Sequence, residues 1–323
     1  MKLDQIIEPI REELDQFHGH FREAMKSKVA FVDMIARYIV RQKGKKIRPA
    51  LVLLTAKACG EINENTFRGA SLVEILHTAT LIHDDVVDDA DTRRGFASIN
   101  AVWKNKIAVL MGDYMLAKGL LLSLDNNDFK FLKITSDAVR RMSEAEILQI
   151  AKSRDLDLDE ETYLRIISDK TASLLSTCTQ IGASSVSGDQ ELIGRMKSFG
   201  ENIGMVFQIR DDLLDYIGRK SITGKPTGLD MKEKKLTLPL IHSLAGAPRS
   251  ESRSILKIIK NGASSKELRH VVDFVSDFGG IAYAEQKAQS YAEVALHALD
   301  QLPPTPAKEA MSQFVDFVME RSK

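Results

Sequence analysis

A long stretch without proline limits the folds open to this chain more than any other feature. No proline lies between Pro49 and Pro226, and apolar residues recur through this region at spacings of three and four. Proline disrupts helix interiors, whereas this spacing places apolar side chains on one face of an α-helix. Neither strand-like alternation nor a strand-helix rhythm is present. The sequence therefore predicts an all-α protein built as a helical bundle.

Length and composition indicate one globular unit that acts on small molecules. The 323 residues are 44% hydrophobic, enough for a large core, and the net charge at pH 7 is zero. A neutral chain is a poor candidate for binding nucleic acid or a charged membrane surface. No linker interrupts the sequence before the proline-rich residues 301–306. We therefore expect a single domain spanning residues 1–323.

The cysteines and the apolar segments bear on localisation. Cys59 and Cys178 lie far apart without metal-ligand spacing, which favours buried free thiols in a reducing compartment. No run of eighteen apolar residues is uninterrupted, and the N-terminus does not look like a signal peptide. These features predict a cytoplasmic protein with no transmembrane segment. The leucine-rich residues 112–124 are expected to pack as core, or to line a substrate tunnel.

Two aspartate triplets lie inside otherwise apolar helical runs. LIHDDVVDD and VFQIRDDLLDY share the spacing i, i+1, i+4, which gathers three carboxylates on one side of a helix. Buried carboxylates need compensating cations. Oxygen ligands of this kind suit Mg²⁺, which usually binds few carboxylates together with substrate phosphates. The triplets therefore predict a site for a metal-bound diphosphate, and the alternative is that each is a solvated acidic helix face. The predicted metal ligands are Asp84, Asp85, Asp88, Asp211, Asp212 and Asp215.

Basic side chains that could bind phosphate gather at helix ends and in loops. Their alternative reading is an ordinary solvated turn, cap or surface loop. Lys170 and Gln208 are polar insertions in buried-looking helices, where a lysine needs an anion or a dipole as partner. His77 precedes the first triplet by two turns and could contact phosphate or simply be a core histidine. The loop and helix-end candidates are Lys45, Lys46, Arg48, Arg93, Arg94, Lys225 and Lys235.

The ordered motifs resemble those of the trans-polyprenyl diphosphate synthases, in particular long-chain octaprenyl and heptaprenyl types. The resemblance covers nearly the whole chain. It includes residues 43–49 (KGKKIRP), residues 77–95 (HTATLIHDDVVDDADTRRG), Gly112, residues 146–149 (EILQ), the Lys170–Thr171 pair, and the second aspartate motif running to residue 241. The family is all-helical, with one large bundle around a central active-site cavity, so the resemblance implies this fold and a prenyltransferase.

The resemblance also implies roles for individual residues. The six aspartates would bind Mg²⁺, as three ions, around an allylic diphosphate. Arg93, Lys170, Lys225 and Lys235 would contact that diphosphate. The diphosphate of isopentenyl diphosphate would be bound by Lys45, Arg48, His77 and Arg94. Near the reacting carbons would lie Gln149, Thr171 and Gln208. The family further implies a homodimer.

Product length is expected to depend on the helix leading into Asp84. One helical turn rises about 5.4 Å, close to one isoprene unit, so successive turns can act as gates. The first turn carries Ala79 and Thr80, both small, and Leu76 and Val73 lie deeper. We therefore expect products longer than twenty carbons, made from farnesyl or geranylgeranyl diphosphate and used for quinone side chains. Phenylalanine at position 79 is expected to shorten them.

Three alternatives remain open at this stage. A short-chain farnesyl or geranylgeranyl diphosphate synthase would differ only in product length. A terpene cyclase shares an aspartate-rich helix but would not need two sets of phosphate-binding cations. A non-catalytic subunit of a heteromeric synthase would be expected to lose aspartates, whereas all six are present here.

Overall fold

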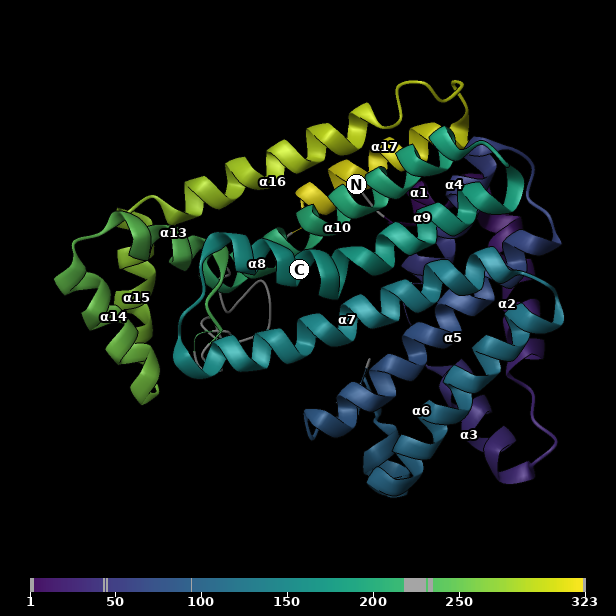
Figure 1. Cartoon of the computed structure of the whole chain (residues 1–323), viewed down its shortest axis with the longest axis horizontal. Coiled ribbons are helices and arrows are strands. Elements are labelled where there is room, and N and C mark those ends of the chain that lie inside the picture. The colour runs from purple at the N-terminus through teal and green to yellow at the C-terminus, as the bar shows by residue number, and fades with distance from the viewer. Residues whose placement is uncertain are drawn as a thin grey trace.

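The protein is a bundle of long helices, as the periodicity predicts (Figure 1). The computed structural model describes residues 3–42, 44, 46–93, 95–217, 231 and 235–321. Its first half contains α1 (Leu3–Ile6), the 3₁₀ turn η1 (Glu8–Ile10), α2 (Arg11–Met25), α3 (Ala30–Arg41), α4 (Ile47–Cys59), α5 (Glu64–Val87), α6 (Ile99–Asp125) and α7 (Phe129–Asp155).

The second half continues in the same manner. It contains α8 (Glu160–Ile167), the π-helical turn η2 (Ser168–Ala172), α9 (Ser173–Val186), α10 (Gln190–Ile217), α13 (Leu238–Gly246), α14 (Arg249–Asn261), α15 (Ser265–Asp277), α16 (Gly280–His297) and α17 (Pro306–Met319). The strands within the described residues are the two-residue β1 (Thr92–Arg93) and β2 (Phe96–Ala97), which pair as an antiparallel hairpin directly after the first aspartate triplet.

Helix α5 lies at the centre of the fold and begins at a well-defined cap. The Asn63 side chain accepts hydrogen bonds from the backbone N–H groups of Asn65 and Thr66, and the Thr66 hydroxyl accepts one from the Asn63 N–H in return. Such a capping box satisfies the unpaired donors of a first helical turn. The helix then packs against α2, α4, α6 and α9, so most of its surface is buried. This central position carries Asp84 and Asp85 to the end of a rigid element.

Helix α6 packs closely on α5 but leaves one apolar face uncovered. A Cβ atom at Gly112 would lie 2.2 Å from the His83 ring, so this approach requires glycine. On the other face Leu110, Leu121 and Leu124 are exposed, as are Val109 and Leu120. The expectation that residues 112–124 form core is therefore wrong for Leu120, Leu121 and Leu124. In length and composition α6 also qualifies as a membrane span, with 33% of the apolar window buried in the fold.

Two clusters of buried side chains form the core, and α10 contributes to both. Phe199 and Ile203 belong to the larger cluster, whereas Ile209 and Leu213, further along the same helix, belong to the second. In addition, the last helix, α17, packs against α1 at the start of the chain. Because one helix joins the clusters and the two ends of the chain meet, we propose that the chain folds as one domain.

The cysteines are free thiols, as expected. Cys178 is fully buried in α9 and Cys59 is half-buried at the end of α4. Burial raises the pKa of both thiols to about 12, so they stay protonated at neutral pH.

Candidate active site

A cavity of about 440 Å³ opens between α5, α7, the π turn and α9. Its polar lining residues come from α4, α5, α7 and the π turn: Arg48, His77, Thr80, Asp84, Ser143, Glu146, Lys170 and Thr171. Its apolar lining consists of Leu81, Val87, Met142, Ile147, Ile150 and Leu174. A polar mouth joined to an apolar wall is what an amphipathic ligand with an ionic head requires.

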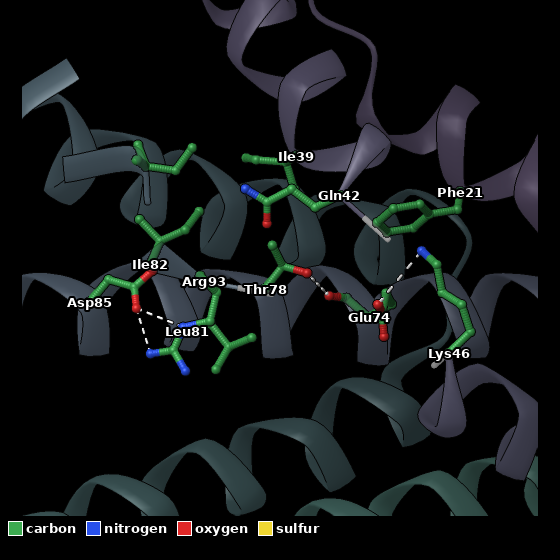
Figure 2. Close-up of a pocket in the computed structure, with 11 residues that line it drawn as sticks. Phe21, Ile39, Gln42, Lys46, Glu74, Thr78, Leu81, Ile82, Asp85 and Arg93 are labelled. Carbon is green, nitrogen blue, oxygen red and sulfur yellow. Dashed lines mark hydrogen bonds and ion pairs between the residues drawn. The ribbon is translucent and has the colours of Figure 1, made fainter. Parts of the chain in front are cut away.

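The first aspartate triplet lies where α5 ends. Asp84 and Asp88 are exposed, and the Asp88 N–H donates to the Asp84 carbonyl 2.8 Å away, which closes the last helical turn. Asp85 points the other way and is only 3% exposed. Its Oδ1 accepts a hydrogen bond from Arg93 Nε at 2.7 Å and forms an ion pair with Nη2 of the same side chain at 2.5 Å (Figure 2). Arg93 thus compensates the buried carboxylate from the hairpin that follows the helix.

The second triplet, on α10, likewise has an exposed first aspartate and a buried second one. Asp211 is exposed, whereas Asp212 is 6% exposed and hydrogen-bonded on both oxygens. Gln208 Nε2 donates to Asp212 Oδ1 at 2.7 Å, and the Tyr163 hydroxyl donates to Oδ2 at 2.7 Å. Asp215 lies one turn further along. In each triplet the central aspartate is buried against protein donors, while its first member is accessible to a ligand.

The π turn presents two of its four polar side chains, Lys170 and Thr171, to the cavity. Lys170 Nζ lies 2.7 Å from Gln149 Oε1 and 2.5 Å from Glu146 Oε2, both on α7. Thr171 Oγ1 donates to Gln208 Oε1 at 2.8 Å. The family resemblance implied that Gln149, Thr171 and Gln208 lie near the reacting carbons. In the structure Gln149 contacts Lys170, and Gln208 contacts Thr171. Glu146, noted only as part of a motif, is a direct partner of Lys170.

Negative charge accumulates at this mouth. Although Asp84 is exposed, surrounding protein atoms displace part of its water, and this partial desolvation is the main cause of its raised pKa; the nearby Glu146 carboxylate raises the pKa further, whereas Lys170 opposes the shift. A carboxylate in such surroundings gains stability from an additional cation. Asp84 therefore fits a role as ligand to a hard divalent ion.

The basic residues at the start of α4 lie on two sides of α5. Arg48 and His77 line the large cavity. Lys46 instead faces a small pocket of about 30 Å³ behind α5, where its Nζ lies 3.9 Å from the buried Glu74 carboxylate and 5.2 Å from the Phe21 ring centre (Figure 2). Glu74 was not predicted from the sequence, because a buried partner on a different helix leaves no local signal.

Other predicted cations have different outcomes. Lys45, Arg94 and Lys225 lie outside the described residues. Lys235 is half-buried in the segment that leads into α13. Arg93 does not line the large cavity, since it is turned toward Asp85 and the small pocket. Its predicted contact with an allylic diphosphate would require that side chain to turn.

A second, narrow cavity of about 10 Å³ continues from the first. His77, Thr80, Met142 and Leu174 border both cavities, and the deeper one is closed by Val73, Leu76, Thr135, Ala138, Val139 and Thr177. Of the expected gate residues, Thr80 and Leu76 therefore lie on the path. Ala79 is fully buried and lines neither cavity. Walls from α7 and α9 complete the path, and the spacing of turns along one helix could not predict them.

Two further residues near the aspartates were missed by sequence reasoning. The Tyr163 hydroxyl bonds Asp212, although 49 positions separate them. Arg321, at the end of the described chain, places Nη1 3.4 Å from Asp211 Oδ1 and stacks 4.3 Å from the Phe207 ring centre. Both contacts join segments distant in sequence, and neither has a motif that would indicate it.

The donor set suits a hard cation that also binds substrate oxygens. Within the described residues, no three histidine, cysteine or acidic side chains converge closely enough to hold a metal ion alone. Each triplet offers accessible carboxylate oxygens on a separate helix, and oxygen donors are those that Mg²⁺ prefers. The expected cage therefore needs phosphate oxygens to complete it. Of the six aspartates, Asp84 lines the large cavity, which it shares with Arg48 and Lys170.

Comparison with known proteins decides the family. Residues 29–275 match the family model described as polyprenyl synthetase. This chain belongs to the polyprenyl synthetase family. It is 35% identical over 317 residues to the all-trans-nonaprenyl-diphosphate synthase (geranyl-diphosphate specific) of Rhodobacter capsulatus, covering 98% of this chain and 97% of that protein. It is 33% identical to the octaprenyl diphosphate synthase of Escherichia coli, with both chains fully covered.

Solved structures of the family share the fold. A polyprenyl synthase from Caulobacter crescentus, complexed with calcium and isoprenyl diphosphate, superposes with a TM-score of 0.88 at 31% identity and covers 100% of this chain and 98% of that one. The all-α fold and the trans-polyprenyl diphosphate synthase resemblance are thus confirmed, and the protein is a prenyltransferase. The other similar proteins include one named heptaprenyl diphosphate synthase component 2, from Bacillus subtilis, which is 29% identical over 99% of this chain and 91% of that protein.

Proposed function

We propose that this prenyltransferase condenses isopentenyl diphosphate head to tail with farnesyl or geranylgeranyl diphosphate, giving a long-chain all-trans polyprenyl diphosphate for quinone side chains. The observation that carries the proposal is a large cavity with charged lining residues that shares part of its wall with a small, mainly apolar cavity. Asp84, Lys170 and Arg48 line the large cavity, and Leu76 and Val73 line the small one.

Divalent cations fit the entrance. The outer carboxylates Asp84, Asp88, Asp211 and Asp215 would hold Mg²⁺, as three ions, with Asp85 and Asp212 supporting them from behind. Bound Mg²⁺ would neutralise the allylic diphosphate and make it a better leaving group. The buried bonds of Asp85 and Asp212 hold the ends of α5 and α10 in place, so that the accessible carboxylates are preorganised.

Lys170 and Thr171 would act on opposite ends of the breaking carbon–oxygen bond. The Lys170 ammonium, held by Gln149 and Glu146, would bind the departing diphosphate. Thr171 uses its hydroxyl proton to bond Gln208. Its oxygen lone pairs therefore remain for the allylic cation that forms beside it. Electrostatic stabilisation of developing charge by fixed groups is commonly the greatest single contribution to catalysis.

The second substrate would enter on the side of Arg48 and His77, which line the same cavity. Lys45 and Arg94 are proposed to contribute to the same diphosphate site. The double bond of isopentenyl diphosphate attacks the cation, the new carbon–carbon bond forms, and a proton leaves the adduct. Because Glu146 is paired with Lys170, we assign that proton to the departing diphosphate. The apolar wall keeps water away from the cation.

The exposed face of α6 supports a homodimer. Val109, Leu110, Leu120, Leu121 and Leu124 are exposed on one side of this helix, and monomers rarely leave large apolar patches uncovered. We propose that a second copy covers this face. The opposite side of α6 is packed along α5, so the helix is part of the bundle, and we place the enzyme in the cytoplasm.

Substitution of the outer aspartates tests the proposal. Asp84→Asn and Asp211→Asn should lower turnover by at least about 100-fold, since each removes a charge that stabilises the transition state. Asp137→Asn is the matched control, because Asp137 is an exposed α7 carboxylate that, among the described residues, is ion-paired with Arg140. Turnover is measured as incorporation of labelled isopentenyl diphosphate at saturating Mg²⁺. Wild-type turnover retained by either site variant, with helical content unchanged, would refute the site.

A further inference from the structure

The helix that carries Lys170 and Thr171 is not a regular α-helix at that point. From Ser168 to Ala172 it widens into a π turn between α8 and α9. A π turn accommodates one extra residue and is usually found where function requires it. Such a departure from regular geometry persists only where neighbouring groups hold it. The side chains around residues 168–172 therefore have to supply that support.

Arg141, on α7, donates hydrogen bonds to the π turn and to α10. Its Nε donates to Asp169 Oδ1 at 2.6 Å, and its Nη2 donates to Glu201 Oε1 at 2.6 Å and to Ser168 Oγ at 3.1 Å. The Ser168 hydroxyl donates to the same Glu201 oxygen at 2.8 Å. One guanidinium thus joins α7, the π turn and α10 through a single network.

The network is charged and largely shielded from solvent. The Arg141 side chain is 19% exposed and that of Glu201 is 26% exposed. Burial alone would lower the pKa of Arg141, but its bonds to Glu201 and Asp169 outweigh that effect and raise the pKa. Burial would likewise raise the pKa of Glu201, and the Arg141 and Ser168 bonds outweigh it and lower the pKa. Arg141 and Glu201 are therefore both ionised at neutral pH.

The three elements joined by Arg141 are those that carry the active site. On α7, Glu146 and Gln149 follow Arg141 and hold Lys170. On α10, Gln208 lies seven residues after Glu201, two turns along the same face, and bonds Thr171. None of Arg141, Asp169 and Glu201 lines the cavity. They can therefore act on substrate only through the residues they position.

We propose that Arg141, Asp169 and Glu201 form a positioning triad that stabilises the π turn. The triad thereby fixes the positions of Lys170 and Thr171 between α7 and α10. Arg141 is a positioning residue and not a catalytic one. The inference rests on the proposed function for its effect on turnover, whereas its effect on the π turn can be measured independently of activity.

The test compares Arg141→Met with Arg140→Met. Arg140 is the adjacent residue, is 58% exposed and, within the described part of the chain, bonds Asp137 and Glu144 on its own helix, so it controls for loss of an arginine on α7. Arg141→Met should accelerate hydrogen exchange at the amides of residues 168–173 by at least about tenfold and lower kcat roughly 10- to 100-fold, since small displacements of catalytic groups have effects of this size. Arg140→Met should leave both quantities within twofold of wild type.

Two additional measurements separate positioning from general loss of structure. Added guanidinium ion, at a concentration well below that which unfolds the protein, should restore part of the kcat of Arg141→Ala, whereas sodium chloride at equal ionic strength should not. If Arg141→Met does not fold, Glu201→Gln replaces it, because this substitution keeps the shape of the side chain and removes its charge. Hydrogen exchange at residues 168–173 and kcat are then measured for that variant.

Unchanged exchange at residues 168–173 in a folded triad variant would overturn the proposal, whatever the activity. Loss of kcat with no rescue by guanidinium would overturn it as well. Lack of turnover in the wild-type protein would count against the proposed function alone, because the exchange comparison would still decide the triad.

Discussion

Thr171 Oγ1 donates a hydrogen bond to Gln208 Oε1 across 2.8 Å, and through it the π turn is joined to the helix of the second aspartate triplet. Gln208 in turn donates a hydrogen bond to Asp212, and the other Asp212 oxygen accepts one from the Tyr163 hydroxyl. A chain of hydrogen-bonded polar groups that is partly shielded from solvent favours one orientation of each member. The geometry of the site thus depends on residues that never touch substrate.

Thr171→Val is expected to lower kcat more than it changes KM for either substrate. Valine has nearly the same shape but lacks the hydroxyl, so it loses both the bond to Gln208 and the oxygen beside the allylic cation. The loss should be roughly 10- to 100-fold. Thr171→Ser keeps the hydroxyl and is the control. Steady-state kinetics decides: equal kcat values for the valine and serine variants would contradict this role.

Tyr163→Phe should destabilise the fold by about 1–3 kcal/mol, because it removes a hydrogen bond to a buried carboxylate oxygen of Asp212. Tyr38→Phe removes a hydroxyl that donates to the exposed Ala97 carbonyl, and should cost less. Urea unfolding followed by circular dichroism gives both values. Equal unfolding free energies for the two variants would show that Asp212 does not depend on this bond.

Thr80→Phe should shorten the product, since Thr80 borders both parts of the cavity and a phenyl ring there would block the way to Leu76. Ala79→Phe, the substitution expected from the spacing of helical turns, introduces a ring at a fully buried position outside both cavities. It should mainly destabilise the protein, by about 1–3 kcal/mol. Chromatography of dephosphorylated products and thermal unfolding of both variants distinguish the two effects. A shorter product from Ala79→Phe alone would reverse this assignment.

The Glu201 carboxylate should contribute to acid sensitivity. Its pKa is lowered in the folded protein from the ordinary value of 4.5. A lowered folded-state pKa means that the stabilisation is present above about pH 4.5 and is lost as pH falls through the folded pKa. Glu201→Gln should therefore show a shallower loss of stability below that pH than wild type does. Urea midpoints between about pH 3 and 6 give the comparison, and parallel curves would contradict it.

The thiols should be inert in the native protein. Cys178 is fully buried with its pKa raised to about 12, and the pKa of the half-buried Cys59 is raised equally. Only the thiolate is an efficient nucleophile, so alkylation by iodoacetamide near pH 8 should be slow until urea unfolds the chain. Mass spectrometry after brief labelling gives the number of alkylated cysteines. Rapid native labelling of Cys178 would show that α9 opens locally.

Much of this architecture could be predicted from residue patterns because it is local. Helical periodicity indicated the all-α class, and the i, i+1, i+4 spacing placed each aspartate triplet on one helical segment. Lys170 and Thr171 were identified as polar insertions or motif residues, and both reach the cavity. His77 and Arg48 likewise line it. These predictions needed only side-chain chemistry and the geometry of one helix.

The remaining features depend on tertiary contacts that sequence spacing does not encode. The π turn at Ser168–Ala172 shifts side chains around the helix axis, yet its residues have no composition that marks it. The bond between Tyr163 and Asp212 and the Arg141 network join separate helices. The leucines of α6 look like core residues in sequence, and only the packing of α5 shows which face is left exposed.

Product analysis tests the long-chain prenyltransferase activity most directly. Purified protein is incubated with Mg²⁺, labelled isopentenyl diphosphate and farnesyl diphosphate, and the dephosphorylated products are separated by chain length. We predict all-trans products of thirty carbons or more. Products that stop at twenty carbons would place the end of the cavity at Leu76 and contradict the long-chain assignment, and no product from the isolated protein would make a partner-dependent synthase subunit the better description.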